Sequence, residues 1–361
     1  MSAEVIERPD TRPSDPDLED GKVAHIIRKD DQMRGYVLGE EITALCGEKF
    51  IPTRDPNRYP VCEACRQALA AAGHPPLAAV GLANQGETVL ASAHDTPVVG
   101  WQGKWANTLR LWGAMPTTLF DLERFNRGDY AAAAEPEALA RTLSRVLYPD
   151  DTTYQGKELR LKQEFFLTSA ALQDILRRFK AGHSNLRDLP KYVAIQMNDT
   201  HPAIAGPELI RLLVDENGMS FDDALETARD CLGYTNHTLL PEALERWATF
   251  TFGTTLPRHM QIVERIDSWH RRTYNPPHYI GIVKHHEVRM GELAFVMAHK
   301  VNGVSALHSD LVKKNLFPEL NALHPGRIIN QTNGVTPRRW LRWCCASGMS
   351  GPHRKMAVRI C

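Results

Sequence analysis

The sequence has no excess of either charge, no long apolar run and no leader-like start. Lys plus Arg and Asp plus Glu both number 43, which gives a formal net charge of +0 at pH 7. Nucleic-acid binders usually show a basic excess, so we expect no nucleic-acid partner. No apolar stretch is as long as a membrane-spanning helix, and residues 1–10 are polar and acidic, unlike a secretory signal. We therefore expect a cytoplasmic protein with no membrane contact.

Cysteine is scarce and odd in number, with 7 in a chain of 361 residues. In a reducing compartment cysteines are more often metal ligands or free thiols than disulfides. Internal repeats and low-complexity tracts are missing as well. What is present is a hydrophobic share of 43%, enough for a sizeable core, in a chain long enough for two or three domains.

The character of the sequence changes several times along the chain. Residues 1–20 are rich in Asp, Glu, Pro and Arg and predict a disordered tail. Residues 21–70 hold a cluster of His, Cys and Pro, and 71–80 look like a linker. From about residue 81 to 341, helical patterns alternate with short β-rich runs, which predicts an α/β domain with a mostly parallel sheet. Residues 342–361 show neither period and predict an irregular tail.

The clearest helix covers residues 158–180. Its apolar residues recur at helical spacing and form one broad face: Phe165, Phe166, Ala170, Leu172, Ile175, Leu176 and Phe179. We interpret this helix as core packing and assign it no chemistry.

Three polar loops share one design. Asn198–Pro202, Tyr234–Pro241 and Gln331–Pro337 each follow a β-rich or apolar run and end at a proline that suits the first turn of a helix. In open α/β sheets, ligands bind at the carboxyl ends of the strands, and Asn, Asp and His side chains suit sugar hydroxyls. Ordinary capping and turn chemistry explains any one loop alone. The three together favour a site for a polar ligand.

Longer motifs occur in a fixed order: NTLRLW, FDLERFNRGDY, SRVLYPDD, GKELRLKQEFF, VAIQMNDTHPA, YTNHTLLPEALERW, VNGVSALHSDLVKKNLF and TNGVTPRRWL. Over about residues 81–341 the chain resembles the α-1,4-glucan phosphorylase family, of the glycogen or maltodextrin type. The resemblance implies a Rossmann-like partial domain of a two-domain glycosyltransferase-type enzyme, whose site lies in the cleft between its domains.

The family catalyses reversible phosphorolysis of an α-1,4-glucan, in which inorganic phosphate takes the terminal glucosyl unit as glucose 1-phosphate. The resemblance implies an oxocarbenium-like transition state and pyridoxal phosphate as the cofactor. It places His237 at the reacting sugar, with Asp199 as a second catalytic residue in the same cleft. Further residues are implied as substrate ligands, namely His201, Asn333 and Glu245, and Trp340 is implied beside the cofactor ring.

Family segments on both sides of this stretch do not occur in the sequence, and the lysine that binds the cofactor is among them. We therefore expect this chain to be inactive alone, and to need a cofactor-domain chain or a homodimer. Two other interpretations stay open. One is a zinc-binding module fused to a catalytically inactive glucan-binding remnant, and the other is the product of a broken or joined gene.

The N-terminal Cys/His cluster predicts a zinc site. Cys62 and Cys65 have the two-residue spacing of a zinc knuckle, and Cys46 and His25 complete a Cys₃His set. A small segment with few large apolar residues also needs a cross-link, such as a bound metal, to fold. A redox pair or free thiols remain the alternative, although no βαβ pattern lies nearby. Residues 5–70 resemble a family of small actinobacterial proteins of unknown function, which implies no chemistry.

Overall fold

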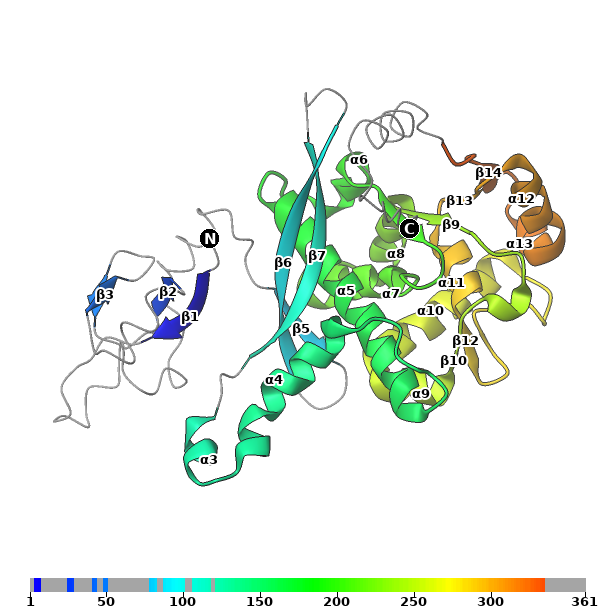
Figure 1. The fold of residues 1–361 in the computed structure, drawn as a ribbon. Helices are drawn as coiled ribbons and strands as arrows, with labels where there is room; N and C mark the ends of the chain where they lie inside the picture. Colours follow the sequence, from blue (N-terminus) through cyan, green and yellow to red (C-terminus); the bar gives the residue numbers. More distant parts are fainter. Residues whose placement is uncertain are drawn as a thin grey trace, which may run out of the picture.

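The computed structural model (Figure 1) describes residues 3–7, 25–28, 41–43, 48–50, 78–82, 87–100, 106–117 and 121–334. Some predicted sites fall outside these ranges, namely Cys46, Cys62, Cys65, Trp340 and the tail 342–361. His25 lies in strand β2, but its side chain is not among those described. The zinc set therefore stays a prediction.

The N-terminal region contributes two short antiparallel pairs. Strand β1 (Ala3–Glu7) pairs with β2 (His25–Arg28), and β3 (Ile42–Thr43) pairs with β4 (Lys49–Phe50). Strand β1 falls inside the segment that the sequence predicts to be a disordered tail.

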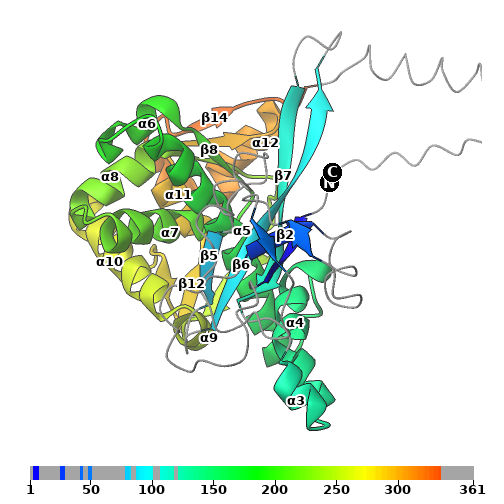
Figure 2. The ribbon, with the colours of Figure 1, turned by 90° about the vertical axis from the view of Figure 1, so that its left-hand side faces the viewer.

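An antiparallel sheet opens the larger domain. It has the order β5 (Ala78–Leu82), β6 (Glu87–Val99), β7 (Ala106–Pro116). Val80, Val89 and Trp112 at its base are buried, whereas Leu109 and Leu111 in the outer half of β7 are exposed. Figures 1 and 2 show β6 and β7 as a long twisted ribbon beside the α/β body. The expectation of a mostly parallel sheet from residue 81 is wrong for this stretch, because β6 and β7 pair antiparallel.

Three helices follow the ribbon, namely α3 (Leu122–Asn126), α4 (Tyr130–Arg145) and α5 (Tyr154–Lys180). The predicted core helix is α5, which starts four residues earlier than expected because the Thr153 side chain accepts a bond from Gly156 N at 3.1 Å and caps it. Arg177, Arg178 and Lys180 in its last turn complement the negative end of the helix dipole. Its buried face includes Leu161, Phe165, Phe166, Leu172 and Leu176.

The predicted parallel sheet is present further along the chain. Its order is β14 (Ile328–Asn330), β13 (Lys300–Gly303), β9 (Leu232–Thr235), β8 (Ile195–Asn198), and every pair is parallel. Helices connect successive strands, as parallel pairing requires. They are α7 (Ala205–Arg211), α8 (Phe221–Cys231), α9 (Thr249–Thr255), α10 (Pro257–Tyr274), α11 (Met290–Met297), α12 (Ala306–Leu311) and α13 (Pro318–Leu323). A small antiparallel sheet has the order β10 (Arg246–Ala248), β12 (Glu287–Arg289), β11 (Val283–Lys284).

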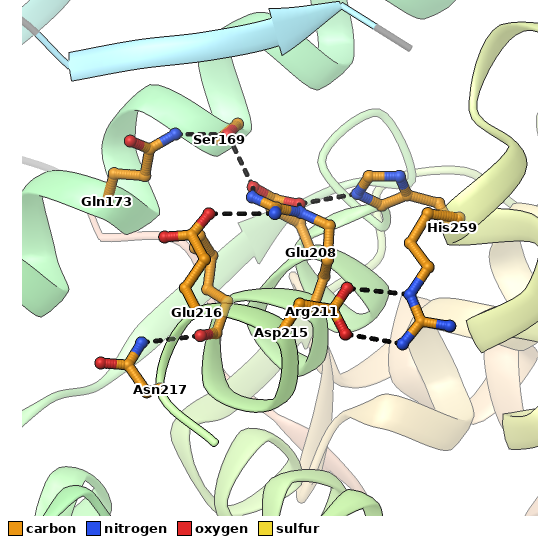
Figure 3. A network of polar contacts seen from close by, with 10 residues as sticks. Ser169, Gln173, Glu208, Arg211, Asp215, Glu216, Asn217 and His259 are labelled. Carbon is orange, nitrogen blue, oxygen red and sulfur yellow. Dashed lines mark hydrogen bonds and ion pairs between the residues drawn. The ribbon is translucent and has the colours of Figure 1, made fainter. Parts of the chain in front are cut away.

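The α/β core contains one buried ionic network (Figure 3). Glu208 on α7 is fully buried, and its carboxylate accepts hydrogen bonds from Ser169 at 2.6 Å and from Arg211 at 2.7 and 3.0 Å, and it contacts His259 Nε2 at 2.6 Å. Burial opposes the charge of Glu208, but His259 and Arg211 outweigh it and lower its pKa to about 2. The network joins α5, α7 and α10 behind the parallel sheet.

Candidate functional site

The loops at the carboxyl ends of the four parallel strands run side by side. We call them the strand-tip row, defined as residues 198–200, 235–238, 302–305 and 330–333. Backbone hydrogen bonds continue past the strands and join the loops, with Asp199 N bonded to Thr235 O at 2.9 Å and Asn236 N to Asn302 O at 3.0 Å. Across the next gap, Gln331 N bonds to Gly303 O at 3.0 Å. The row is therefore one continuous edge, with Asp199 near one end and Asn333 near the other.

His237 and Asp199 lie next to each other in this row. His237 Nε2 is 2.6 Å from Asn198 Oδ1, which fixes the exposed imidazole over the tip of β8. Asp199 has a left-handed backbone with φ of 60°, and its carboxylate accepts a bond from Thr200 N at 2.8 Å. This conformation tolerates Asp better than most residues, because the short side chain bonds to the adjacent backbone. It turns the chain sharply at the end of β8.

His308 joins the same end of the row from α12. Its Nδ1 accepts a bond from Val304 N at 3.2 Å, and its Nε2 is buried with no hydrogen-bond partner. Burial lowers the pKa of His308, the Thr238 backbone opposes that effect, and the nearby His237 and Asp199 lower and raise it respectively. His308 therefore lies near His237 and Asp199.

Asn333 lies on the other side of the row. Its N–H donates to Val304 O at 2.9 Å, so the loop after β14 is tied to the loop after β13 that precedes His308. The Asn333 side chain is exposed. The row thus presents polar groups from both of its ends to one edge of the sheet.

The other two expected substrate ligands, His201 and Glu245, lie in a separate group. We call this group the carboxylate pocket, defined by Asp151, Arg160, Glu164, His201 and Glu245. Asp151, Arg160, His201 and Glu245 line a pocket of about 600 Å³, whereas Glu164 lines a smaller one of about 140 Å³ that also contacts Arg160 and His201.

Arg160 forms ion pairs with all three carboxylates of the carboxylate pocket. Its guanidinium contacts Asp151 at 2.6 Å, Glu245 at 2.8 Å and Glu164 at 3.4 Å. Burial opposes its charge, but the Glu245 and Glu164 carboxylates raise its pKa. Arg160 and Glu164 both lie on α5, to which the sequence analysis assigned no chemistry. The available signal was their spacing of four residues beside the helix's apolar face, which brings both side chains to one surface.

The carboxyl groups of Glu164 and Glu245 are poorly solvated, and the pKa values of Glu164 and His201 are raised. Burial raises the pKa of Glu164 to about 8, and the adjacent Glu245 carboxylate raises it too. The adjacent carboxyl groups of Glu164 and then of Glu245 raise the pKa of His201 to about 10. The pocket therefore favours a protonated His201 imidazole between two carboxyl groups, an arrangement that can exchange protons with a bound ligand.

No helix in the described part of the chain is both long enough and apolar enough to cross a membrane. Cys231 in the last turn of α8 is buried.

An α/β fold whose parallel strands end in a polar edge is the arrangement of a sugar- or nucleotide-binding enzyme domain. Residues 77–350 match the family model described as carbohydrate phosphorylase, and the chain belongs to that family. The resemblance expected from the motifs is confirmed. The match continues past residue 341 into the segment that the sequence analysis separates as a tail.

Among similar proteins, glycogen phosphorylase of Haemophilus influenzae is 46% identical over 266 residues, which cover 71% of this chain and 32% of the relative. The brain form of human glycogen phosphorylase is 43% identical over 277 residues, covering 72% and 33%. The H isozyme of α-glucan phosphorylase from Solanum tuberosum is 44% identical over 277 residues, with the same coverage. The chain thus spans about a third of the length of these relatives.

A second family model matches residues 17–71. It is described as a protein of unknown function, DUF3039. This agrees with the resemblance expected over residues 5–70, and it assigns that segment no chemistry.

Proposed function

We propose that this chain supplies the sugar-binding face of an α-1,4-glucan phosphorylase, the glycosyltransferase-type enzyme that cleaves glycogen or maltodextrin with phosphate to give glucose 1-phosphate. The observation that supports this most directly is the strand-tip row. His237 and Asp199, which are far apart in the sequence, lie together in this row at one edge of a parallel sheet, in a member of the carbohydrate phosphorylase family.

In this proposal His237 and Asp199 stand at the reacting sugar. Glycoside cleavage develops positive charge at the anomeric carbon, and preorganised dipoles stabilise it. The hydrogen bond from His237 to Asn198 holds the His237 ring and backbone in place before substrate arrives. The remaining substrate ligands are Asn333 in the row, and His201 and Glu245 in the carboxylate pocket.

Pyridoxal phosphate is the family's cofactor in this proposal, but the described residues do not fit a covalent attachment. None of the four loops of the strand-tip row contains a lysine, and a Schiff base needs one. Trp340, the residue assigned to the cofactor ring, lies outside the described residues. We therefore place the attachment lysine outside the strand-tip row and derive no step through the cofactor.

The first test measures sugar binding by calorimetry, with maltoheptaose as the ligand and the full chain as the protein. His237→Ala and Asn333→Ala should each weaken binding about tenfold, or about 1.4 kcal/mol. His278→Gln, at an exposed histidine away from the row, is the matched control and should bind as the parent does. Equal affinity of all the variants would remove the row from the site.

The second test measures turnover. A cofactor-bearing segment of a family relative is supplied in trans with pyridoxal phosphate, maltoheptaose and inorganic phosphate, and glucose 1-phosphate is measured. We expect release with the parent chain and none with His237→Ala. Undiminished release by His237→Ala would refute its catalytic assignment.

A second candidate function is a zinc-binding module fused to an inactive glucan-binding remnant. The separate family match over residues 17–71 and the lysine-free row favour it. Zinc content by mass spectrometry should be one equivalent per chain, and it should fall in a Cys62→Ser, Cys65→Ser variant. Zinc that stays in that variant would refute the Cys₃His ligand set.

A further inference from the structure

Glu164, His201 and Glu245 come from three separate elements and meet at one point of the carboxylate pocket. Glu164 lies in the middle of α5, His201 follows β8, and Glu245 precedes β10. One ligand atom from each residue lies within 4.8 Å of the other two. Both carboxyl side chains are well buried, with exposed fractions of 10% for Glu164 and 8% for Glu245.

The spacing of these atoms is too wide for hydrogen bonds. His201 Nδ1 is 3.7 Å from Glu164 Oε1 and 3.8 Å from Glu245 Oε1, and no atom completes a hydrogen bond to it. On a tetrahedral ion with bonds of about 2.1 Å, neighbouring ligand atoms are about 3.4 Å apart. The imidazole is therefore spaced from the Oε1 atoms of both carboxylates nearly as it would be if these three atoms bound one ion.

Each carboxylate also has an unused oxygen. Glu164 Oε2 and Glu245 Oε2 are buried without a hydrogen-bond partner, whereas the Oε1 atoms face Arg160. Leaving a buried carboxylate oxygen unpaired is costly, so buried oxygens of this kind usually have a ligand. Arg160 shares its single positive charge among three carboxylates, since it also pairs with Asp151. The pocket therefore has space for a further cation, which would displace the proton that His201 holds at neutral pH.

The geometry points to a divalent cation of the Mn²⁺ or Zn²⁺ type bound by Glu164, His201 and Glu245. One imidazole and two carboxylates are ligands that both ions accept. The pocket of about 600 Å³ beside His201 and Glu245 gives an entry path and space for water in the remaining coordination positions. Arg160 keeps its contacts with Asp151 and the Oε1 atoms and orients the two carboxylates around the ion.

The test uses Mn²⁺ because it disfavours thiolate ligands and so avoids the Cys/His module. Equilibrium dialysis of the full chain should give one bound Mn²⁺ per chain. Glu164→Gln and Glu245→Gln preserve shape, and each should weaken binding at least about tenfold. Glu242→Gln, at an exposed carboxylate on the rim of the same pocket, is the matched control and should bind as the parent does.

Two further measurements keep the inference decidable if a variant fails to fold. Electron spin-echo spectra of Mn²⁺ on the parent chain should show the nitrogen coupling of one imidazole, and His201→Gln should abolish it. The Cys62→Ser, Cys65→Ser variant should bind Mn²⁺ unchanged. Absence of binding at millimolar Mn²⁺, or of the nitrogen coupling, would overturn the assignment. None of these readouts requires glucan, so their failure leaves the proposed phosphorylase function standing.

Discussion

His270 on α10 and His324 after α13 approach each other inside the core, with their Nε2 atoms 3.0 Å apart. Both are buried, and one Nε2 must donate while the other accepts, which requires that at least the accepting imidazole be neutral. Burial, and then the charge of Arg327, lowers the pKa of His324 to about 3. Burial likewise lowers the pKa of His270 to about 4, against partial opposition by Asp267.

The histidine pair predicts that acid destabilises the fold. The ordinary pKa of histidine is 6.5. Below that pH the two histidines bind protons in the unfolded chain but not in the folded protein. The free energy of unfolding should be at its plateau for this pair above pH 6.5 and fall as the pH drops toward 4. Urea titrations across that range measure the slope.

A variant isolates this contribution. His324→Phe removes one titrating ring from an aromatic surrounding that includes Tyr274 and Phe295. It should flatten the pH dependence, although it lowers stability at pH 7 by leaving His270 without its partner. His278→Gln, at an exposed position, should leave the slope as it is. Equal slopes for parent and His324→Phe would contradict the prediction.

The buried network around Glu208 predicts a large loss of stability on neutralisation. Glu208→Gln leaves Arg211 and His259 without a buried counter-charge, which should cost about 3 kcal/mol in the free energy of unfolding. Asp215→Asn is the control, because the Asp215–Arg258 pair, at 2.6 Å, is partly exposed and should cost about 1 kcal/mol at most. Equal losses in the free energy of unfolding for Glu208→Gln and Asp215→Asn, measured with urea, would contradict the role given to burial.

Gly303 at the end of β13 predicts that the packing of α12 against this strand affects sugar binding at the strand-tip row. A Cβ there would lie 2.4 Å from Ser309 Oγ and 2.8 Å from Ser309 Cα, so Gly303→Ala must displace α12 and with it His308. We expect lower stability and weaker maltoheptaose binding. Gly182→Ala, where nothing lies within 4 Å of the new Cβ, should change neither. Normal sugar binding by Gly303→Ala would separate α12 from the site.

The left-handed conformation of Asp199 predicts different effects for two substitutions. Asn also tolerates this conformation, so Asp199→Asn should unfold at the same urea concentration as the parent. Asp199→Ala should lose about 1 kcal/mol, because alanine gains nothing from local hydrogen bonding. If both variants matched the parent in stability, the backbone at this residue would not be under the strain that its φ indicates.

Sequence pattern predicted α5 and the parallel sheet. The apolar period predicted α5 to within its first turn, because it is a pattern of neighbouring residues. The alternation of β-rich and helical runs predicted the parallel sheet, because parallel strands need helical crossover connections. The ribbon β6–β7 was mispredicted as part of that sheet. The pairing of β6 with β7 is antiparallel because the chain reverses its direction between them. The residue types within each strand do not reveal that direction.

The candidate site was only partly predictable for the same reason. Asp199, His237 and Asn333 lie in one row, as expected from loops that follow parallel strands. His201 and Glu245 instead face Glu164 and Arg160, across a contact between residues far apart in the sequence. A polar residue beside an apolar helical face looks solvent-exposed in sequence, and only the packing of α5 against the loop at Glu245 buries Glu164.

Strand β7 also affects how the chain behaves in solution. It is the last strand of its sheet among the described residues, is 11 residues long, and exposes Leu109 and Leu111. A strand of that length at a sheet border offers main-chain donors and acceptors to any other extended segment, including the same strand of a second molecule. Concentrated samples should therefore form dimers or larger aggregates through this border, and a proline or lysine placed in the outer half of β7 should suppress them.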